Sequence, residues 1–441
     1  MAATNYLDQY DATPQAGKFP LVSRWMSSEP LPFFKELRER RPILVTPQCT
    51  LLARFDDVTE VLNMPLVFTV ALYVPKMQDG LYLMAHDDDA LHTREKSLMQ
   101  SLLNRDDLPQ VRAMVADICR KLLHASPGGI EVVNGYCRMV PATLVRQYFG
   151  LTGVDLKDLI EWSYWNQYDT FHNQPFSQVA EAMRRQIEQR HNETGAKLTD
   201  YLTGLVARRL AAVKLQQLAG LALAPLTFLR RLAGAQDHTL SDDIVTRMLR
   251  TSYPAAVEFD IKRLAVNAGG LLIGAIETTS QAAAQVIQYL LQDPMLLATA
   301  VNAAQLDDPK ALDGIVWEAL RFVPISPYLF RQAASEYTVG KGSDRATTIA
   351  PGTYVLPLIQ SAMFDPAAFE RPDEFVAGRN WYHYFHFGFG SHECLGKYVG
   401  MVMIPEMVRQ VLLKPGLQAK GDIDYKAGPF PEHYELSWRS G

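Results

Sequence analysis

One cysteine of the sequence lies among residues that could hold a metal. Cys394 ends the run Phe385-His386-Phe387-Gly388-Phe389-Gly390-Ser391-His392-Glu393-Cys394, and Leu395-Gly396 follows it. The glycines let the backbone approach a bulky planar group. A helical pattern begins at Lys397, and the N-terminus of a helix favours an anion beside it. We interpret Cys394 as a thiolate that serves as a single metal ligand.

The same region also permits a zinc site. His383, His386 and His392 lie close to Cys394 in the sequence, and all four are zinc-ligand types. Their spacings fit none of the usual ligand pairs, and no second cysteine is nearby. Zinc therefore stays as the alternative to a single-thiolate site.

The cysteine segment resembles the haem-binding signature of the cytochrome P-450 family, Phe-x-x-Gly-x-[Arg/His]-x-Cys-x-Gly. The matching residues are Phe387, Gly390, His392, Cys394 and Gly396. The resemblance implies haem b as cofactor, with Cys394 as the proximal iron ligand and Phe387 and Gly396 beside it. A thiolate ligand pushes electron density onto the iron and favours O–O cleavage.

The longest apolar stretch, 264–292, contains a single formal charge, Glu277. Its Gly274-Ala275-Ile276-Glu277-Thr278 resembles the family's oxygen-activation motif, which implies that Glu277 and Thr278 relay protons. The alternative is a threonine bonded back to its own helix beside a buried acid with a partner. An unpaired acid in so apolar a helix is costly, which favours the catalytic interpretation. By length the stretch could span a bilayer, but its polar side chains favour a central helix of a globular domain.

A further motif of the family lies upstream of the cysteine segment, as the family's order requires. Glu318 and Arg321 match its Glu-x-x-Arg pair, which lies on one helix face and can form a buried ion pair. Before the cysteine segment the family has an arginine that joins this pair, whereas this sequence has Glu374 there. Arg371 and Arg379 are the candidates to replace it.

The resemblance also implies which cations bind the haem propionates. Asp87-Asp88-Asp89-Ala90-Leu91-His92-Thr93-Arg94-Glu95-Lys96 is similar to the family segment that ends in His-Thr-Arg. His92 and Lys96 would bind the propionates together with Arg331 and His392. Lysine neutralises a carboxylate but cannot form the bidentate fork of arginine.

An apolar, aromatic-rich substrate pocket is expected, and hence a hydrophobic organic substrate. Its candidate lining residues come from five stretches of the chain, although the aromatic ones could equally pack in the core. They are Phe68, Tyr82, Trp165, Leu271, Ala275, Tyr328, Leu329 and Phe430.

The elements that must position these residues are mostly helical. Short apolar runs at 42–45 and 49–53 indicate paired strands, 56–62 a capped helix, and 397–413 a long helix. Strand character returns at 337–339, at 352–356 and near the C-terminus. We expect a mainly α fold with small peripheral β-sheets. The resemblance implies that this is the single-domain cytochrome P-450 fold, with a long central helix over the haem. The segment 205–232 indicates an amphipathic helix pair broken at Pro225.

Composition sets the outer limits. The 441 residues are nearly half hydrophobic, and 43 Lys+Arg against 48 Asp+Glu give 43 − 48 = −5, which excludes disorder and a nucleic-acid binder built on basic charge. Cys49, Cys119 and Cys137 indicate buried, inert thiols and a cytoplasmic location. Without a linker we expect one domain over 1–441, with 1–20 loosely ordered and neither a signal peptide nor a membrane anchor.

Taken together, the sequence predicts a haem-thiolate monooxygenase that inserts one oxygen atom from O₂ into a small hydrophobic substrate. No flavin or dinucleotide-binding loop is present, so a separate ferredoxin and its NAD(P)H-dependent reductase are expected to supply the electrons. Two alternatives stay open. The first is a peroxide-using peroxygenase or hydroperoxide isomerase, and the second is a non-catalytic haem-based ligand sensor.

Overall fold

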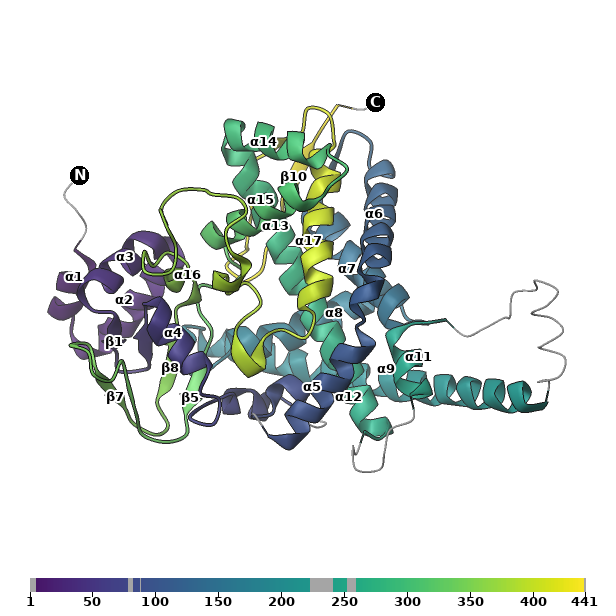
Figure 1. The fold of residues 1–441 in the computed structure, drawn as a ribbon, viewed down its shortest axis with the longest axis horizontal. Helices are drawn as coiled ribbons and strands as arrows, with labels where there is room; N and C mark the ends of the chain where they lie inside the picture. Colours follow the sequence, from purple (N-terminus) through teal and green to yellow (C-terminus); the bar gives the residue numbers. More distant parts are fainter. Residues whose placement is uncertain (1–4, 78–81, 88, 223–240, 252–258, 440–441) are drawn as a thin grey trace.

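A computed structural model of the chain describes residues 5–77, 82–87, 89–222, 241–251 and 259–439. It is mainly helical, with three small sheets at its periphery (Figure 1). The helices are α1 (Tyr6–Ala12), α2 (Gln15–Ser28), α3 (Pro30–Arg40), α4 (Phe55–Leu62), α5 (Ala90–Leu102), α6 (Leu108–His124), α7 (Met139–Leu144), α8 (Leu156–Gln167), α9 (Glu181–Ala222), α11 (Ile244–Arg250), α12 (Ile261–Ala275), α13 (Glu277–Gln292), α14 (Pro294–Ala304), α15 (Lys310–Phe322), α16 (Ile359–Ala362) and α17 (Lys397–Leu412).

Short 3-10 and π turns connect these helices. They are η1 (Ala71–Lys76), η2 (Leu83–Ala85), η3 (Arg105–Asp107), η4 (Val133–Cys137), η5 (Val145–Phe149), η6 (Tyr168–His172), η8 (Trp381–His383) and η9 (Gly390–His392). The expected fold class is confirmed, and so are the helices expected at 56–62 and 397–413, which correspond to α4 and α17.

The largest sheet has five strands in the order β1-β2-β8-β5-β3, with β1 (Ile43–Val45), β2 (Thr50–Leu52), β3 (Phe68–Thr69), β5 (Arg331–Ala333) and β8 (Tyr354–Pro357). The predicted pair β1 and β2 is antiparallel, with Ile43 opposite Leu52. The other sheets are β4-β10-β9, with β4 (Gly129–Glu131), β9 (Gln418–Ala419) and β10 (Glu435–Ser437), and β6-β7, with β6 (Tyr337–Val339) and β7 (Thr347–Ile349).

Helices α12, α13 and α17 run through the interior of the helical part of the molecule. Helix α17 packs against α6, α13 and α15, while α12 packs against α8 and α9. These helices bury apolar side chains on more than one side, as expected of helices surrounded by other helices. They therefore bring the glutamate of the apolar stretch and the cysteine segment into one core.

The central helix is interrupted, although one continuous helix was expected over 264–292. Helix α12 ends at Ala275 and α13 begins at Glu277, with Ile276 between them. The interruption could not be predicted from the sequence, because isoleucine is not a helix-breaking residue. The side chains that compensate the broken turn come from other segments, as described below.

The N-terminal segment was expected to be loosely ordered over 1–20, and this expectation is wrong for residues 5–20. They form α1 and the start of α2. Tyr6, Leu7 and Tyr10 are buried at helical spacing, and Phe19 joins the same apolar cluster with residues of α3 and the first sheet. Burial of this helical apolar face explains the order.

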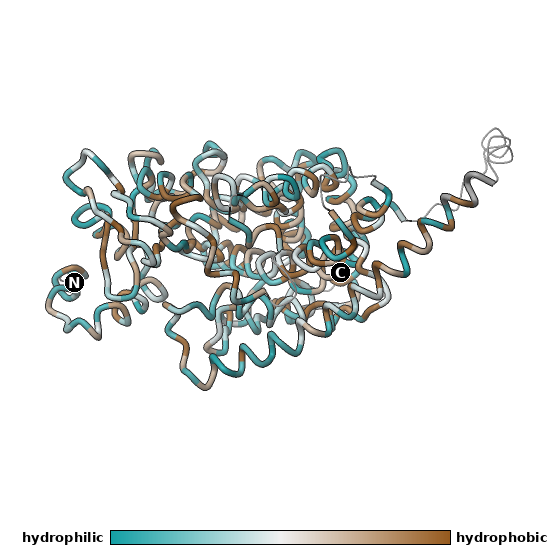
Figure 2. The backbone as a smooth tube through the Cα atoms, turned by 90° about the horizontal axis from the view of Figure 1, so that it is seen from below, coloured by the Kyte–Doolittle hydropathy of each residue, from teal (hydrophilic) through white to brown (hydrophobic). Residues whose placement is uncertain are grey.

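Helix α9 extends well beyond the body of the molecule (Figures 1 and 2). Residues 205–222 form the end of this helix, and the rest of the predicted helix pair, including Pro225, lies outside the described residues. Hydrophilic and hydrophobic residues alternate along the projecting part (Figure 2). No described helix is both long enough and apolar enough to cross a membrane.

Candidate active site

The cysteine segment forms a tight loop that leads into α17. The Cys394 amide donates to the carbonyl of Phe387 over 2.8 Å, and the Glu393 amide donates to that of Gly390 over 3.0 Å. Gly390 has a φ of +71°, and a Cβ there would lie 2.8 Å from the carbonyl oxygen of Leu62. Only glycine suits this position, because both the conformation and the contact exclude a side chain.

Cys394 lines a cavity of about 450 Å³ deep in the molecule. The side chain is exposed to this cavity rather than to bulk water. Burial raises the pKa of the Cys394 thiol, while the Gly396 N–H and the nearby Lys96 act in the opposite direction. The expected N–H contact is present, but burial outweighs it in the protein alone, so a thiolate here needs a bound cation.

The predicted neighbours of Cys394 occupy the same cavity. Phe387 lines it, and its ring also packs so closely on α17 that a Cβ on Gly400 would lie 2.8 Å from it. Gly396 and His392 line the cavity too. Burial lowers the pKa of His392 to about 3, so this imidazole is neutral.

Cations approach the cavity from one side. Arg331 lines it, is 5% exposed, and donates from Nη1 only to the carbonyl of Phe330, with no carboxylate partner in the described part of the chain. A buried guanidinium without a counter-ion is a ready site for an anion. The His92 ring stacks on His392 at 4.6 Å, and Lys96 donates to the backbone carbonyls of Ser391 and Glu393. His92 and Lys96 thus contact the loop without lining the cavity.

On another wall of the cavity lies the start of α13. Thr278 lines the cavity, and its hydroxyl donates to the Gly274 carbonyl over 2.7 Å. Gly274 itself leaves open space, because a Cβ there would meet nothing within 4 Å. Ala275 also lines this wall. The threonine therefore has the back-bonded geometry that the sequence analysis held as an alternative.

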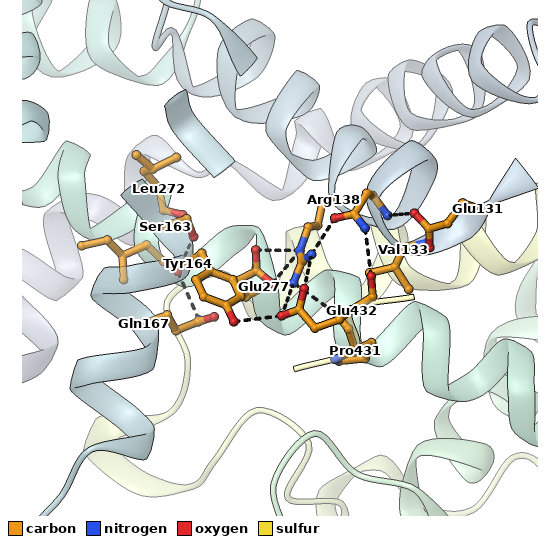
Figure 3. A network of polar contacts seen from close by, with 12 residues as sticks. Glu131, Val133, Arg138, Ser163, Tyr164, Gln167, Leu272, Glu277, Pro431 and Glu432 are labelled. Carbon is orange, nitrogen blue, oxygen red and sulfur yellow. Dashed lines mark hydrogen bonds and ion pairs between the residues drawn. The ribbon is translucent and has the colours of Figure 1, made fainter. Parts of the chain in front are cut away.

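Glu277 does not line the cavity and is not unpaired, which corrects the argument from an isolated acid. The Arg138 Nε lies 3.1 and 3.0 Å from the two oxygens of Glu277. Arg138 also binds Glu432, whose carboxylate accepts the Tyr164 hydroxyl over 2.8 Å. Figure 3 shows Glu277, Glu432 and Tyr164 around the guanidinium of Arg138, the fourth member of the network. They come from α13, the turn before α7, the C-terminal segment and α8.

The pKa of the Glu277 carboxyl in this network differs from its ordinary value. Burial raises the pKa of Glu277 to about 7, Arg138 opposes the shift, and Glu432 adds to it. One guanidinium thus faces two carboxylates, of which Glu277 is 1% exposed. A carboxyl group that titrates near neutral pH can hold and release a proton under ordinary conditions.

Side chains of α8 compensate the break at Ile276. Carbonyls of α12 that lose helical partners there accept from other donors: the Ser163 hydroxyl lies 3.4 Å from the oxygen of Leu272 and 3.3 Å from that of Ile273, and the Gln167 Nε2 lies 3.1 Å from Ile273. Figure 3 shows Ser163 and Gln167 beside Leu272. With the bond from Thr278, three successive carbonyls are satisfied by side chains.

The Glu318–Arg321 pair is buried and bidentate, with distances of 2.7 and 3.1 Å and no exposure of either side chain. Arg379 is its third member, with its Nε 3.1 Å from the Glu318 carboxylate, whereas Arg371 is exposed and pairs with Glu374. Burial opposes the ionisation of Glu318, but bonds from Arg321 and Tyr384 lower the pKa of Glu318 overall. The network fixes the segment before the cysteine loop.

The structure divides the eight residues expected in the substrate pocket into two groups of four. Four of them line the cavity, namely Tyr82, Leu271, Ala275 and Leu329. The other four are aromatic residues that pack elsewhere: Phe68 on Tyr337, Tyr328 on Phe176, and Trp165 and Phe430 in the cluster around Tyr164 and Tyr168. An aromatic side chain fills a core as readily as a pocket, so residue type alone could not separate them.

The remaining cysteines are buried as predicted, and burial raises the pKa of Cys49 and Cys119 to about 12. The zinc alternative finds no support in the structure. No group of three or more metal-ligand side chains occurs among the residues it describes.

Several residues of the site escaped sequence analysis, namely Arg138, Ser163, Gln167, Glu432 and Lys76. One signal was available for Arg138. It stands as a lone charge between the uncharged runs 132–137 and 139–144, and such a cation needs a buried partner. Glu277 is the matching lone anion of the other apolar helix. Ser163 and Gln167 have no comparable signal in the sequence.

Comparison with known proteins identifies the family. The profile of the family "Cytochrome P450" matches residues 134–419, which is more than half of the chain and includes Glu277, Glu318, Arg321 and Cys394. The chain belongs to the cytochrome P450 family. It is accordingly an oxidoreductase of a monooxygenase family, with a small-molecule substrate and O₂ as reactants.

Named relatives and solved structures agree. The chain is 23% identical over 375 residues to a steroid C26-monooxygenase of Mycobacterium tuberculosis (83% of this chain, 87% of the relative) and 25% identical to the cyclomarin C epoxidase CymV of Salinispora arenicola (82% and 83%). The open cytochrome P450 EryK from S. erythraea superposes with a TM-score of 0.74 at 20% identity (94% and 98%), and CYP109Q5 from Chondromyces apiculatus with 0.71 at 18% (94% and 97%).

The residues present fit the haem-thiolate cofactor that the family implies. The cavity offers a thiol, neighbouring glycines, and a buried guanidinium that lacks a counter-ion. A dianionic, planar, iron-containing ligand satisfies all three. The Ser391 hydroxyl is buried without a partner in the loop that precedes Cys394, and a hydroxyl can donate to a carboxylate of such a ligand.

Proposed function

We propose that this chain is a haem b monooxygenase that inserts one oxygen atom of O₂ into a hydrophobic small organic substrate, by hydroxylation, epoxidation or dealkylation. The observation that carries the proposal is that Cys394 and Thr278 line one cavity whose walls are otherwise mainly apolar. Bound haem would supply the activation of O₂ and the oxidation of the substrate.

In this proposal the chain's own residues each have a definite task. Cys394 would ligate the iron, with Phe387 and Gly396 beside it, and Arg331 and His392 would hold the propionates with His92 and Lys96 behind them. Leu271, Ala275 and Leu329 exclude water and hold the apolar part of the substrate. Glu318 and Arg321 keep the loop in place.

Proton supply falls to the network around Arg138. Glu432 has a side chain 19% exposed, Arg138 joins it to Glu277, and Glu277 immediately precedes Thr278. A proton held by Glu277 can pass to the cavity once the carboxyl turns away from Arg138. The Thr278 hydroxyl, whose hydrogen goes to Gly274, keeps its oxygen lone pairs for an incoming donor.

Electrons have to come from outside, and we propose a ferredoxin with an NAD(P)H-dependent reductase as their source. The 441-residue sequence has no Gly-x-Gly-x-x-Gly dinucleotide-binding loop, which supports a separate protein as the electron source. The relatives named above share only the monooxygenase class with this proposal, and the substrate of this chain is argued separately below.

The decisive measurement is the absorption spectrum of the reduced CO complex, before and after Cys394→Ala. We expect the strongly red-shifted Soret band of thiolate ligation in the wild-type protein and its loss in the variant. Cys137→Ala is the control, because this buried thiol lies outside the cavity. A wild-type spectrum without the band would refute the assignment.

A peroxide-using enzyme is the second candidate, and one observation favours it: both Glu277 and Thr278 are engaged in bonds that a proton relay has to break. Turnover with hydrogen peroxide and with a ferredoxin system separates the two. We expect the ferredoxin system to be faster. Equal rates would remove Glu277 and Thr278 from the mechanism. A protein that binds CO but never consumes O₂ with any substrate would instead be a sensor.

A further inference from the structure

A second cavity, of about 410 Å³, adjoins the active-site cavity. We call it the polar chamber and define it by Lys76, Asp169, Asn173, Gln174, Glu188 and His191. Lys76 and His191 line both cavities, so they form the wall that the two share. The chamber differs in character from its neighbour, because most of its lining side chains are polar.

The hydrogen-bond donors of the chamber are already used. The Asn173 Nδ2 donates to Asp169 over 2.7 Å, and the Gln174 Nε2 donates to the Thr170 carbonyl over 2.5 Å. The Lys76 ammonium donates to the same carboxylate of Asp169 over 2.9 Å. The chamber therefore has few donors to offer to a ligand.

Several hydrogen-bond acceptors of the polar chamber, in contrast, have no donor. Asn173 Oδ1, Gln174 Oε1 and His191 Nδ1 are buried without a hydrogen-bond partner, on side chains that are 1%, 0% and 6% exposed. The two amides cannot be turned round, because each would then direct an oxygen at another oxygen. His191 Nδ1 lies 4.0 Å from Asp169, too far for a hydrogen bond.

The formal charges that line the chamber balance, with Lys76 and Arg184 against Asp169 and Glu188. The Lys76–Asp169 pair is internally neutral, and Arg184 points its guanidinium at the backbone carbonyls of Asn173 and Gln174. No ion pair in the described part of the chain involves Glu188, which is exposed at the chamber on α9. Arg184 and Glu188 are thus the lining charges without an ion-pair partner among the described residues, and of the two only the anion Glu188 can accept from a cationic donor.

We infer that the polar chamber binds a group that donates several hydrogen bonds, either a cluster of hydroxyls or a protonated nitrogen base, at one end of a substrate whose apolar part lies in the active-site cavity. This inference rests on the proposed function, and it narrows the substrate class to amphiphiles. Buried acceptors without donors are costly to a folded protein, and such a ligand would satisfy them.

Binding of three probes by calorimetry tests the inference. Octyl β-glucoside offers hydroxyl donors, its fully O-methylated form keeps the apolar tail but has no donors, and octylguanidinium offers a cationic donor. We expect at least one donor probe to bind about tenfold more tightly than the O-methylated probe, as two or more hydrogen bonds would provide. Equal affinity of all three probes would overturn the inference.

Variants of the chamber locate the binding. Gln174→Met removes one acceptor, and we expect about fivefold weaker binding of the preferred donor probe. Glu188→Gln should weaken octylguanidinium by a similar factor, with little effect on the glucoside. Glu193→Gln is the matched control, since Glu193 is exposed on the same helix but pairs with Arg190 away from the chamber.

The outcomes separate this inference from the proposed function. Calorimetric binding needs no turnover, so a missing thiolate spectrum with intact donor preference would refute the function and leave the chamber in place. A normal spectrum without donor preference would refute the chamber alone. If Gln174→Met does not fold, Glu188→Gln, which changes an exposed side chain, still tests whether octylguanidinium binds in the chamber. The comparison of the two glucosides on the wild-type protein decides for the hydroxyl probe.

Discussion

Glu277 and Arg379 show how single residues of this site depend on partners far away in the sequence. Sequence analysis treated Glu277 as unpaired and left Arg379 as one of two candidates for the third member of the Glu318–Arg321 network. In the structure, Glu277 pairs with Arg138 and Arg379 pairs with Glu318. Their contributions can be measured separately, because the two networks share no residue.

For Glu277 the direction of a pH effect follows from its pKa. Its folded-state pKa of about 7 exceeds the ordinary value of 4.5, so the folded protein binds the proton more tightly than the unfolded chain. The free energy of unfolding should therefore fall as the pH rises from 4.5 through 7, and then level off. Glu277→Gln removes this component.

Urea unfolding of the wild-type protein and of Glu277→Gln at pH 5.5 and pH 8 measures the effect. We expect the wild-type protein to lose more stability than the variant between these values, since all other titrating groups are common to both. An identical loss in both proteins would show that Glu277 is ionised throughout this range.

Arg379 should matter far more than Arg371. Arg379→Ala takes one charged hydrogen bond from the buried Glu318, and we expect a destabilisation of about 1.5–3 kcal/mol. Arg371→Ala breaks only an exposed pair with Glu374 and should cost less than about 1 kcal/mol. Equal effects in denaturant unfolding would contradict the role of Arg379 as the third member of the network.

At the residue scale, sequence analysis predicted best the positions of residues whose type is uncommon in the neighbouring sequence. Cys394, Glu318 and Arg321 lie where the motifs placed them, and Arg379 was one of two candidates. Predictions that relied on abundant types were weaker, as the four displaced aromatic residues show. The partners Arg138 and Glu432 could not be paired with Glu277, because a sequence does not say which distant charges meet.

At the scale of elements, the break between α12 and α13 is the feature on which the cavity depends. Helix α8 reaches it through Ser163 and Gln167. The strands, α4 and α17 were predictable from local patterns. The break was not predictable, because the hydrogen bonds that compensate it come from another helix.

Removing the Gln167 amide should loosen this break. In Gln167→Met the Ile273 carbonyl loses the nearer of its two side-chain donors and keeps only the Ser163 hydroxyl, and we expect faster hydrogen exchange of peptides that cover 272–280. The proposed monooxygenase should also release more peroxide per NAD(P)H consumed, since Thr278 is less well placed.

Gln360→Met is the matched control, because Gln360 is equally buried and its Nε2 also donates to a backbone carbonyl, that of Phe322 over 2.9 Å. It should leave exchange at 272–280 unchanged. If both variants changed exchange there equally, Gln167 would have no special role in holding the break.

At the scale of the whole molecule, the N-terminal helices belong to the folded body. Leu7 is 1% exposed in the cluster that joins α1 to α3 and the first sheet. Leu7→Ala should therefore cost about 2–5 kcal/mol, as for other buried leucines. Asp11→Ala, on the same helix but exposed, should cost less than about 1 kcal/mol. Similar melting temperatures for the two variants would mean that α1 is only loosely attached.

The Arg138 network also sets the order in which the site can be completed during synthesis of the chain. Arg138 is made early, Glu277 much later, and Glu432 only 432 − 394 = 38 residues after the cysteine. Until that last carboxylate is present, Arg138 and Glu277 lack their third charge. A nascent chain that already carries the complete cysteine loop therefore still lacks its proton supply, and the cofactor pocket and the acid network mature as separate events.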